Sequence, residues 1–229
     1  MTGKVVMVTG ANGGLGTSVT EALLEAGATV VGVSLHIQQS DFKHVGFTAM
    51  AAEISTVESA KNVVETIVTR FGKLDVVVHT VGGFAGGPSI VDTDEATFQR
   101  MLDLNLTSAF YLLRAAIPQL RKSGSGRLIA IGSRAALEPG PGAGAYSASK
   151  AALVSLIRTA ALENKDSGMT ANTILPGTID TPANRKAMPG ADVSKWVRPG
   201  AIAGLIVWLC GEDGKEITGA AIPVYGSDV

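Results

Sequence analysis

The chain has 229 residues, of which 46% are hydrophobic and 17% are charged, and its 19 basic and 20 acidic side chains give a formal net charge of −1. We expect such an apolar, nearly neutral chain to fold, and it has no excess of basic residues for binding nucleic acid or a membrane surface. The single cysteine, Cys210, excludes an intrachain disulfide framework and a multi-cysteine metal site, so we expect a buried thiol, no metal and a cytoplasmic protein. The 28 glycines exceed the usual ~7% and need a structural explanation.

Apolar runs of strand length alternate with helical repeats along the whole chain. The first run, 4–9, ends in a glycine-rich turn, and apolar residues then recur at helical spacing up to Gly27, a residue expected at a helix C-cap. We predict further strands at 29–34, 47–53, 74–79, 127–133, 170–175 and 220–224, and helices at 57–71, 98–120, 146–162 and 201–209. Continuous apolar strands are typical of sheets covered by helices on both faces, and no linker divides the chain. The sequence therefore predicts one α/β domain over residues 1–229, a doubly wound parallel sheet of about seven strands.

Unusual residues stand where the predicted strands end, which is the edge at which open parallel sheets bind ligands. They are the glycine-rich turn 10–16, Ser34, Glu53, the stretch 82–87, Ser133 and the pair 176–177. Glycines let the backbone approach a ligand closely, and the N-terminus of the following helix offers N–H groups to a pyrophosphate. A lone glycine-rich turn is also consistent with a tight strand-to-helix connection, but the order of these features favours a dinucleotide site.

Tyr146 and Lys150 are four residues apart and lie on one face of the predicted helix 146–162. An ammonium beside a phenol favours the phenolate and lowers the phenol pKa from its ordinary ~10. Taken alone, the pair is more often a solvated helix face. Ser133, at the end of a strand, could hydrogen-bond a carbonyl oxygen held between it and the phenol, and the three side chains together favour a catalytic site.

With these motifs, the chain resembles the short-chain dehydrogenase/reductase family over essentially its whole length. Residues 9–16 match the family's Thr-Gly-x-x-x-Gly-x-Gly cofactor turn, and residues 176–181 are similar to its segment that contacts the nicotinamide and the phosphates. The catalytic tetrad of the family falls on Asn105, Ser133, Tyr146 and Lys150. The resemblance implies a Rossmann-type fold and an NAD(P)-dependent oxidoreductase that transfers a hydride between the nicotinamide and a carbonyl or alcohol carbon.

The resemblance also assigns a role to each residue. Tyr146 is the general acid or base, Lys150 holds the nicotinamide ribose and lowers the Tyr146 pKa, Ser133 polarises the substrate oxygen, and Asn105 positions a water that relays the proton. The cofactor is expected against Gly10, Asn12, Gly14, Leu15, Gly16, Ser34, Glu53, Val81, Gly82, Tyr146, Lys150, Pro176, Gly177, Ile179 and Thr181. The family resemblance further suggests a homotetramer or homodimer built from the long helices; the apolar face of Leu153, Leu156 and Ile157 is consistent with an interface or with the core.

Several residues depart from the family pattern. His79-Thr80-Val81-Gly82 replaces the usual Asn-Asn-Ala-Gly, so His79 either contacts the cofactor or is a structural imidazole. The stretches 83–87, 180–186 and 188–189 are similar to the dihydropteridine reductase branch, where an aromatic side chain at the position of Phe84 lies near the pterin. That branch lacks the serine found here as Ser133, which favours ordinary carbonyl or alcohol substrates.

Three further residues are candidates for the substrate pocket: Phe84, Arg185 and Trp196. Each has a structural alternative, namely packing for Phe84, a solvated cation for Arg185 and an aromatic anchor of the core for Trp196.

The cofactor choice depends on Ser34, which stands where an acid would hold the adenosine ribose of NAD. A neutral side chain removes repulsion against a 2′-phosphate, although no Arg or Lys stands beside it, so we expect NADP ahead of NAD. The partner is then a small carbonyl, alcohol or pterin compound. A pteridine reductase is the alternative activity, and a dinucleotide-binding sensor or interaction protein without catalysis is the alternative class.

Overall fold

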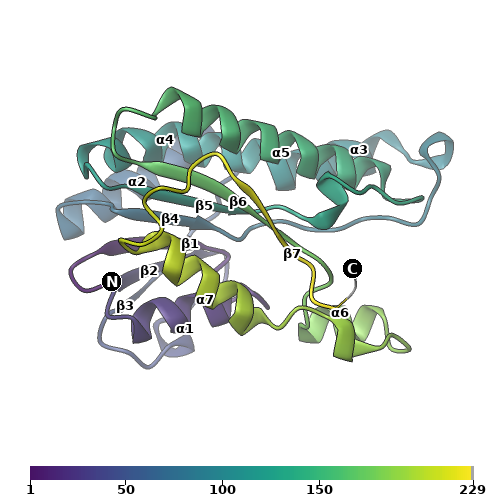
Figure 1. Ribbon diagram of the computed structural model, residues 1–229, viewed down its shortest axis with the longest axis horizontal. Helices are drawn as coiled ribbons and strands as arrows, with labels where there is room; N and C mark the ends of the chain where they lie inside the picture. The colour runs from purple at the N-terminus through teal and green to yellow at the C-terminus, as the bar shows by residue number, and fades with distance from the viewer. Residues whose placement is uncertain (228–229) are drawn as a thin grey trace.

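Seven parallel strands form the centre of the computed structural model, which describes residues 1–227 (Figure 1). They are β1 (Val5–Thr9), β2 (Thr29–Ser34), β3 (Phe47–Ala51), β4 (Val76–His79), β5 (Arg127–Ile131), β6 (Thr170–Pro176) and β7 (Ala221–Val224). Their order in the sheet is β3-β2-β1-β4-β5-β6-β7, so the order reverses between β1 and β4. The predicted doubly wound α/β sheet is confirmed, and every strand boundary lies within two residues of its expected position.

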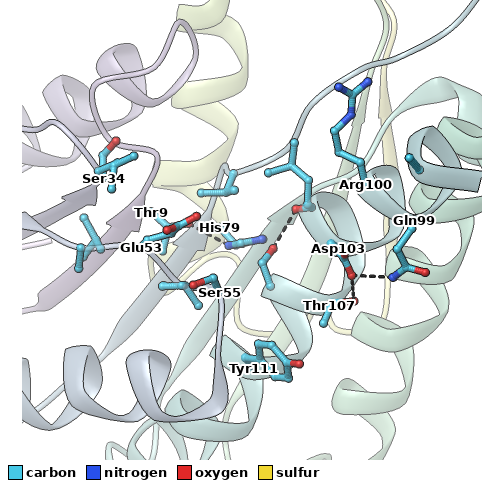
Figure 2. Close-up of a pocket in the computed structure, with 18 residues that line it drawn as sticks. Thr9, Ser34, Glu53, Ser55, His79, Gln99, Arg100, Asp103, Thr107 and Tyr111 are labelled. Carbon is cyan, nitrogen blue, oxygen red and sulfur yellow. Dashed lines mark hydrogen bonds between the residues drawn. The ribbon is translucent and has the colours of Figure 1, made fainter.

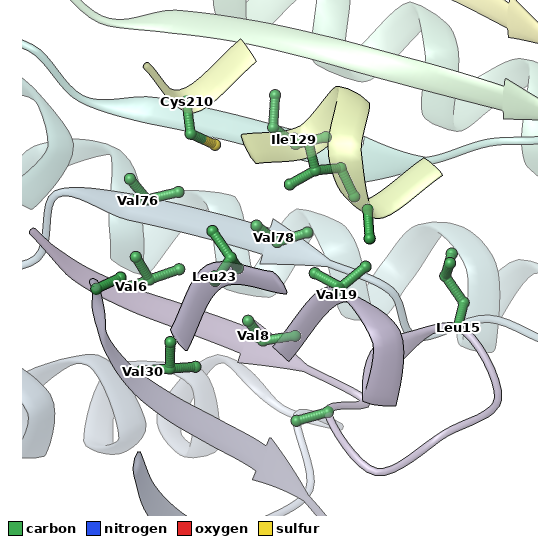
Figure 3. Close-up of a cluster of buried hydrophobic side chains, with 14 of the residues drawn as sticks. Val6, Val8, Leu15, Val19, Leu23, Val30, Val76, Val78, Ile129 and Cys210 are labelled. Carbon is green, nitrogen blue, oxygen red and sulfur yellow. The ribbon is translucent and has the colours of Figure 1, made fainter. Parts of the chain in front are cut away.

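Helices cover both faces of the sheet because successive strand residues point to opposite sides. Val6 and Val8 of β1 belong to the apolar layer beneath α1 (Gly16–Glu25) and α7 (Pro199–Cys210), where Cys210 is also buried (Figure 3). Val5 and Met7 belong to the opposite layer, beneath α2 (Val57–Phe71), α4 (Ser108–Lys122) and α5 (Gly144–Glu163). With both layers apolar, the strands read as unbroken hydrophobic runs.

The predicted helix 98–120 differs in the structure. It begins earlier, with α3 (Glu95–Leu102), because the Asp94 carboxylate caps it by accepting a 2.7 Å hydrogen bond from Thr97 N–H. A π-helical turn, Asp103–Thr107, then separates α3 from α4, and Ser108 N–H donates to the carbonyl of Asp103, five residues back. Such turns are rare and occur mostly at functional sites, and this one contains Asn105.

A short helix, α6 (Pro182–Ala187), was not predicted. Thr181 caps it by accepting a 3.2 Å hydrogen bond from Asn184 N–H, and Pro182 occupies its first turn. Threonine followed by proline is a common helix start, so the sequence contained a signal for this helix.

Across residues 1–227, no helix is long and apolar enough to span a bilayer, and no three His, Cys, Asp or Glu side chains are grouped to hold a metal ion.

Candidate active site

Two cavities lie along the carboxyl edge of the sheet, and the larger one is lined by Thr9 and His79 at the ends of β1 and β4, where the strand order reverses. One, of about 860 Å³, is lined by Ser34, Glu53, His79 and Val81 and extends to α3 and α4 (Figure 2). The other, of about 540 Å³, lies at the ends of β5 and β6. Its lining includes the candidate site residues Phe84, Ser133, Tyr146, Pro176, Gly177 and Ile179. The two cavities thus contain nine of the sequence-predicted site residues, whereas the glycine-rich turn, Asn105 and Lys150 are not part of either lining.

The glycine-rich turn after β1 is packed so closely that several of its positions have no room for a side chain. Gly10 has a φ of +70°, and a Cβ on it would lie 2.8 Å from the Thr80 hydroxyl. A Cβ on Gly16 would collide with the carbonyl oxygen of Gly10, and one on Gly14 would lie 2.9 Å from the Thr181 side chain. The helix that follows has no side chain capping its N-terminus within the described residues, so its first N–H groups face the turn.

Tyr146, at the start of α5, is mostly buried. Burial raises the pKa of its phenol above the ordinary 10, and a hydrogen bond with the Ser133 hydroxyl opposes this rise. Its ring meets the Phe84 ring edge to face, with the ring centroids 5.0 Å apart. We expected Lys150 to lower the pKa of Tyr146, whereas in this structure burial raises it.

Lys150 lies one helical turn further along α5 and is almost completely buried. Its ammonium donates a 2.9 Å hydrogen bond to the carbonyl of Ile131, at the end of β5. Burial lowers the pKa of Lys150 to about 8. A buried amine that uses one acceptor for its three N–H groups within the described residues retains capacity to bind another polar group.

Asn105, in the π-helical turn, connects α5 to the loop after β4. Its Oδ1 accepts from Gly83 N–H at 2.9 Å, and its Nδ2 donates to Gly83 O and Ser149 Oγ at 3.0 Å each. Ser149 in turn donates to the Tyr146 carbonyl at 2.7 Å. Both amide N–H groups of Asn105 are thus used, which leaves neither for the expected relay water. Sequence reasoning missed Ser149, although it stands between Tyr146 and Lys150.

His79, at the end of β4, is fully buried, and its two ring nitrogens differ in their hydrogen bonding. Its Nδ1 lies 2.9 Å from the Thr9 hydroxyl, whereas its Nε2 has no partner among residues 1–227. Figure 2 shows this second nitrogen on the side of the ring away from Thr9. Burial and the positive charge of Lys150 lower the His79 pKa to about 3, so the ring is neutral.

Two of the three candidate pocket residues lie apart from the 540 Å³ cavity. Arg185 is exposed and pairs with Asp180 through two hydrogen bonds, of 2.6 and 2.8 Å. Trp196 is partly buried and is not part of the cavity lining, whereas Phe84 is part of it and is 68% exposed.

The same cavity has lining residues that sequence reasoning missed. On α6 these are Asn184 and Ala187, with Met188 directly after the helix. Beside Ser133 they are Arg134 and Glu138, which form a 2.6 Å ion pair. Because Arg134 directly follows Ser133 at the end of a strand, the sequence could have indicated that it lines the same cavity. The apolar face of α5 is part of the core, since Leu153 and Ile157 are fully buried and Leu156 packs against them.

The family model "short chain dehydrogenase" matches residues 4–192 of this chain. Dehydrogenase/reductase SDR family member 4 of Bos taurus is 30% identical, and the alignment covers 99% of this chain and 87% of that protein. D-beta-hydroxybutyrate dehydrogenase of Rhizobium meliloti (strain 1021) is 28% identical, with 97% of each chain covered.

Solved structures share the fold over the whole chain. A blue fluorescent protein from a metagenomic library, in complex with NADPH, is 28% identical with a TM-score of 0.85, covering 99% of this chain and 98% of its own. NAD⁺-bound xylitol dehydrogenase is 24% identical with a TM-score of 0.88, covering 98% of each chain, and shows the fold.

Proposed function

Because this chain belongs to the short-chain dehydrogenase/reductase family, we propose that Asn105, Ser133, Tyr146 and Lys150 form its catalytic group. The chain is an NAD(P)-dependent oxidoreductase that acts on alcohol or carbonyl groups. The observation that carries the residue assignment is that Ser133 and Tyr146 line the same 540 Å³ cavity, where burial raises the pKa of the Tyr146 phenol and the Ser133 hydroxyl opposes that rise. That cavity leaves room for a substrate oxygen to meet both hydroxyls.

The residues at the strand ends are suited to a nicotinamide dinucleotide. The uncapped N-terminus of α1 and the glycine-rich turn would bind the pyrophosphate, because only glycine is accommodated at the closest approaches. Ser34, Glu53 and Val81 would hold the adenosine half, and Gly82, Lys150, Pro176, Gly177, Ile179 and Thr181 the nicotinamide half. When bound, the nicotinamide accepts or supplies the hydride.

Tyr146 would move the proton at the substrate oxygen. Since its pKa is above the ordinary value, the phenol is protonated at neutral pH and ready to act as an acid in carbonyl reduction. Ser133 would polarise the same oxygen, and Lys150 would bind the nicotinamide ribose with its remaining donors. Asn105 would hold the 82–83 loop against α5, so a relay water needs an anchor other than the amide N–H groups.

The 540 Å³ cavity favours uncharged substrates. Its lining combines Phe84, Ile179 and Met188 with the two hydroxyls, and its cation Arg134 is neutralised by Glu138. A pterin remains the second candidate because the exposed Phe84 ring, held edge to face on Tyr146, offers a surface on which a flat ring can stack. Oxidation of NAD(P)H by quinonoid dihydropterin, compared with a panel of ketones, distinguishes the two.

The choice between NADP and NAD depends on the groups around the adenosine ribose. Beside the uncharged Ser34, on which the expected preference for NADP rested, the glycine-rich turn holds a carboxylate, since Asn12 Nδ2 donates a hydrogen bond to Asp41 Oδ2.

We also propose self-association through the outer surfaces of α4 and α5, giving a homodimer or homotetramer. Phe110 on α4 and Leu162 on α5 leave 45% and 66% of their surfaces exposed. Exposed apolar surface of this kind is buried when two helix faces pack between subunits.

Replacing Tyr146 with Phe tests the catalytic assignment. Loss of the proton donor should lower kcat about a hundredfold or more, while the Kd for NAD(P)H changes less than about twofold. Stopped-flow absorbance of the nicotinamide and a fluorescence titration measure the two quantities, and the melting temperature controls for folding. Turnover at the wild-type rate would refute the role of Tyr146.

A further inference from the structure

A carboxylate from outside the strands lies beside the glycine-rich turn. Asp41 ends the 3₁₀ turn Gln39–Asp41, and its Oδ2 accepts a 3.2 Å hydrogen bond from Asn12 Nδ2. Asn12 belongs to the glycine-rich turn, in which Gly10 N–H donates to the carbonyl of Val33 at 2.7 Å, next to the end of β2. Asp41 therefore lies at the corner between this turn and β2, where an acid at position 34 would otherwise act.

Several contacts fix the turn that carries Asp41. The Gln39 side-chain amide makes two 2.9 Å hydrogen bonds to the main chain of the edge strand β3. Phe42, the next residue, is buried with its ring centroid 4.6 Å from that of Phe47. Asp41 Oδ2 also accepts from Gln38 N–H at 3.1 Å. The position of the carboxylate is thus set by the fold, although the group itself is exposed.

The charge at this corner is negative. Glu53 lines the adjoining 860 Å³ cavity, and neither it nor Asp41 takes part in an ion pair within the described part of the chain. Gly13 contributes no side chain, and the nearest cation along the chain is Lys43, two residues beyond Asp41. The same cavity contains the unpartnered, fully buried His79 Nε2, an independent sign that a polar ligand belongs there.

We infer that Asp41 makes this enzyme prefer NAD over NADP, by accepting a hydrogen bond from the adenosine ribose and repelling a 2′-phosphate. The inference rests on the proposed dinucleotide site. A carboxylate binds a ribose hydroxyl well, whereas a phosphate of about two negative charges is repelled by it. Because Ser34 has no charge, the discrimination between NAD and NADP depends on Asp41 in the 3₁₀ turn.

The test compares Kd values of NADH and NADPH, measured by fluorescence titration on wild type, Asp41→Asn and a control, Asp213→Asn. Asparagine keeps an acceptor for Gln38 N–H and removes only the charge. The control removes an equal charge from an exposed position after α7. Wild type should bind NADH more tightly, Asp41→Asn should shift the ratio of the two Kd values about tenfold toward NADPH, and Asp213→Asn should shift it less than about twofold. Added salt should reduce the wild-type discrimination more than that of Asp41→Asn.

The possible negative results separate an error about Asp41 from an error about the proposed cofactor site. Binding of both nucleotides with an unchanged ratio in Asp41→Asn, or a shift produced by Glu53→Gln in its place, would overturn the inference alone. Tighter binding of NADPH than of NADH by the wild type would also overturn the inference about Asp41. Binding of neither nucleotide by the folded wild type would overturn the proposed cofactor residues and the inference with them.

Discussion

His79 and Lys150 are buried bases whose pKa values lie below their ordinary values of 6.5 and 10.5, at about 3 and about 8. Burial is the main cause for both, because the protein interior disfavours the charged form. In the unfolded chain each group is in water and has its ordinary pKa. Between its folded and unfolded pKa values, each group therefore binds more protons in the unfolded chain than in the folded one. Stability must accordingly rise with pH from about 3 to 6.5 on account of His79, and from about 8 to 10.5 on account of Lys150.

The His79→Asn variant isolates the acid part of this effect. At pH 5 the unfolded wild type has taken up a proton that the folded form excludes, so wild type should lose roughly 2 kcal/mol between pH 7 and pH 5 that the variant keeps. Asparagine can still hydrogen-bond Thr9. Urea unfolding at both pH values measures the difference, with exposed His36→Asn as the matched control. Parallel pH profiles for wild type and His79→Asn would contradict the expectation.

The junction between β1 and α1 has room for glycine only. In Gly16→Ala the new methyl group would collide with the Gly10 carbonyl, so the turn must open. We expect a loss of about 2 kcal/mol or more in stability and a loss of dinucleotide affinity. In the control Gly204→Ala, the methyl group on α7 meets no atom within 4 Å, and helix propensity should stabilise the protein by up to about 1 kcal/mol. Chemical denaturation and NADH titration measure both effects; equal behaviour of the two variants would show that the turn tolerates a side chain.

Elements whose signals are local were predictable from sequence, as β2 and α2 show by matching their expected bounds. The π-helical turn was not, because its i to i+5 register is set by contacts of Asn105 with Gly83 and Ser149, 22 and 44 residues away. The same limit applies to the ribose corner. Its expected residue, Ser34, followed from a spacing rule, whereas Asp41 reaches Asn12 across 29 residues of chain.

The two edges of the sheet differ in how completely their polar groups are hydrogen-bonded. At the amino edge, buried Asp75 accepts from Val5 N–H at 2.8 Å and Ser123 Oγ at 2.9 Å and lies 3.0 Å from the Lys73 ammonium. At the carboxyl edge lie glycines and incompletely bonded groups, among them His79 Nε2 in the lining of the 860 Å³ cavity and the Lys150 ammonium at the end of β5. Polar groups at the amino edge are satisfied within the protein, whereas groups at the carboxyl edge remain able to bind a ligand. The site residues therefore come from the loops that follow several different strands.

Self-association through the outer surface of α4 and α5 can be disrupted by a charge placed there. If the protein self-associates there, Phe110→Glu should place a charge within an apolar interface and shift the molecule toward monomer, since an unpaired buried charge is costly. Val45→Glu is the control, because Val45 is fully exposed in the loop before β3 and the same charge meets only water. Light scattering coupled to size exclusion measures both masses. A wild-type mass equal to one chain, or an assembly unchanged by Phe110→Glu, would remove α4 and α5 as the interface.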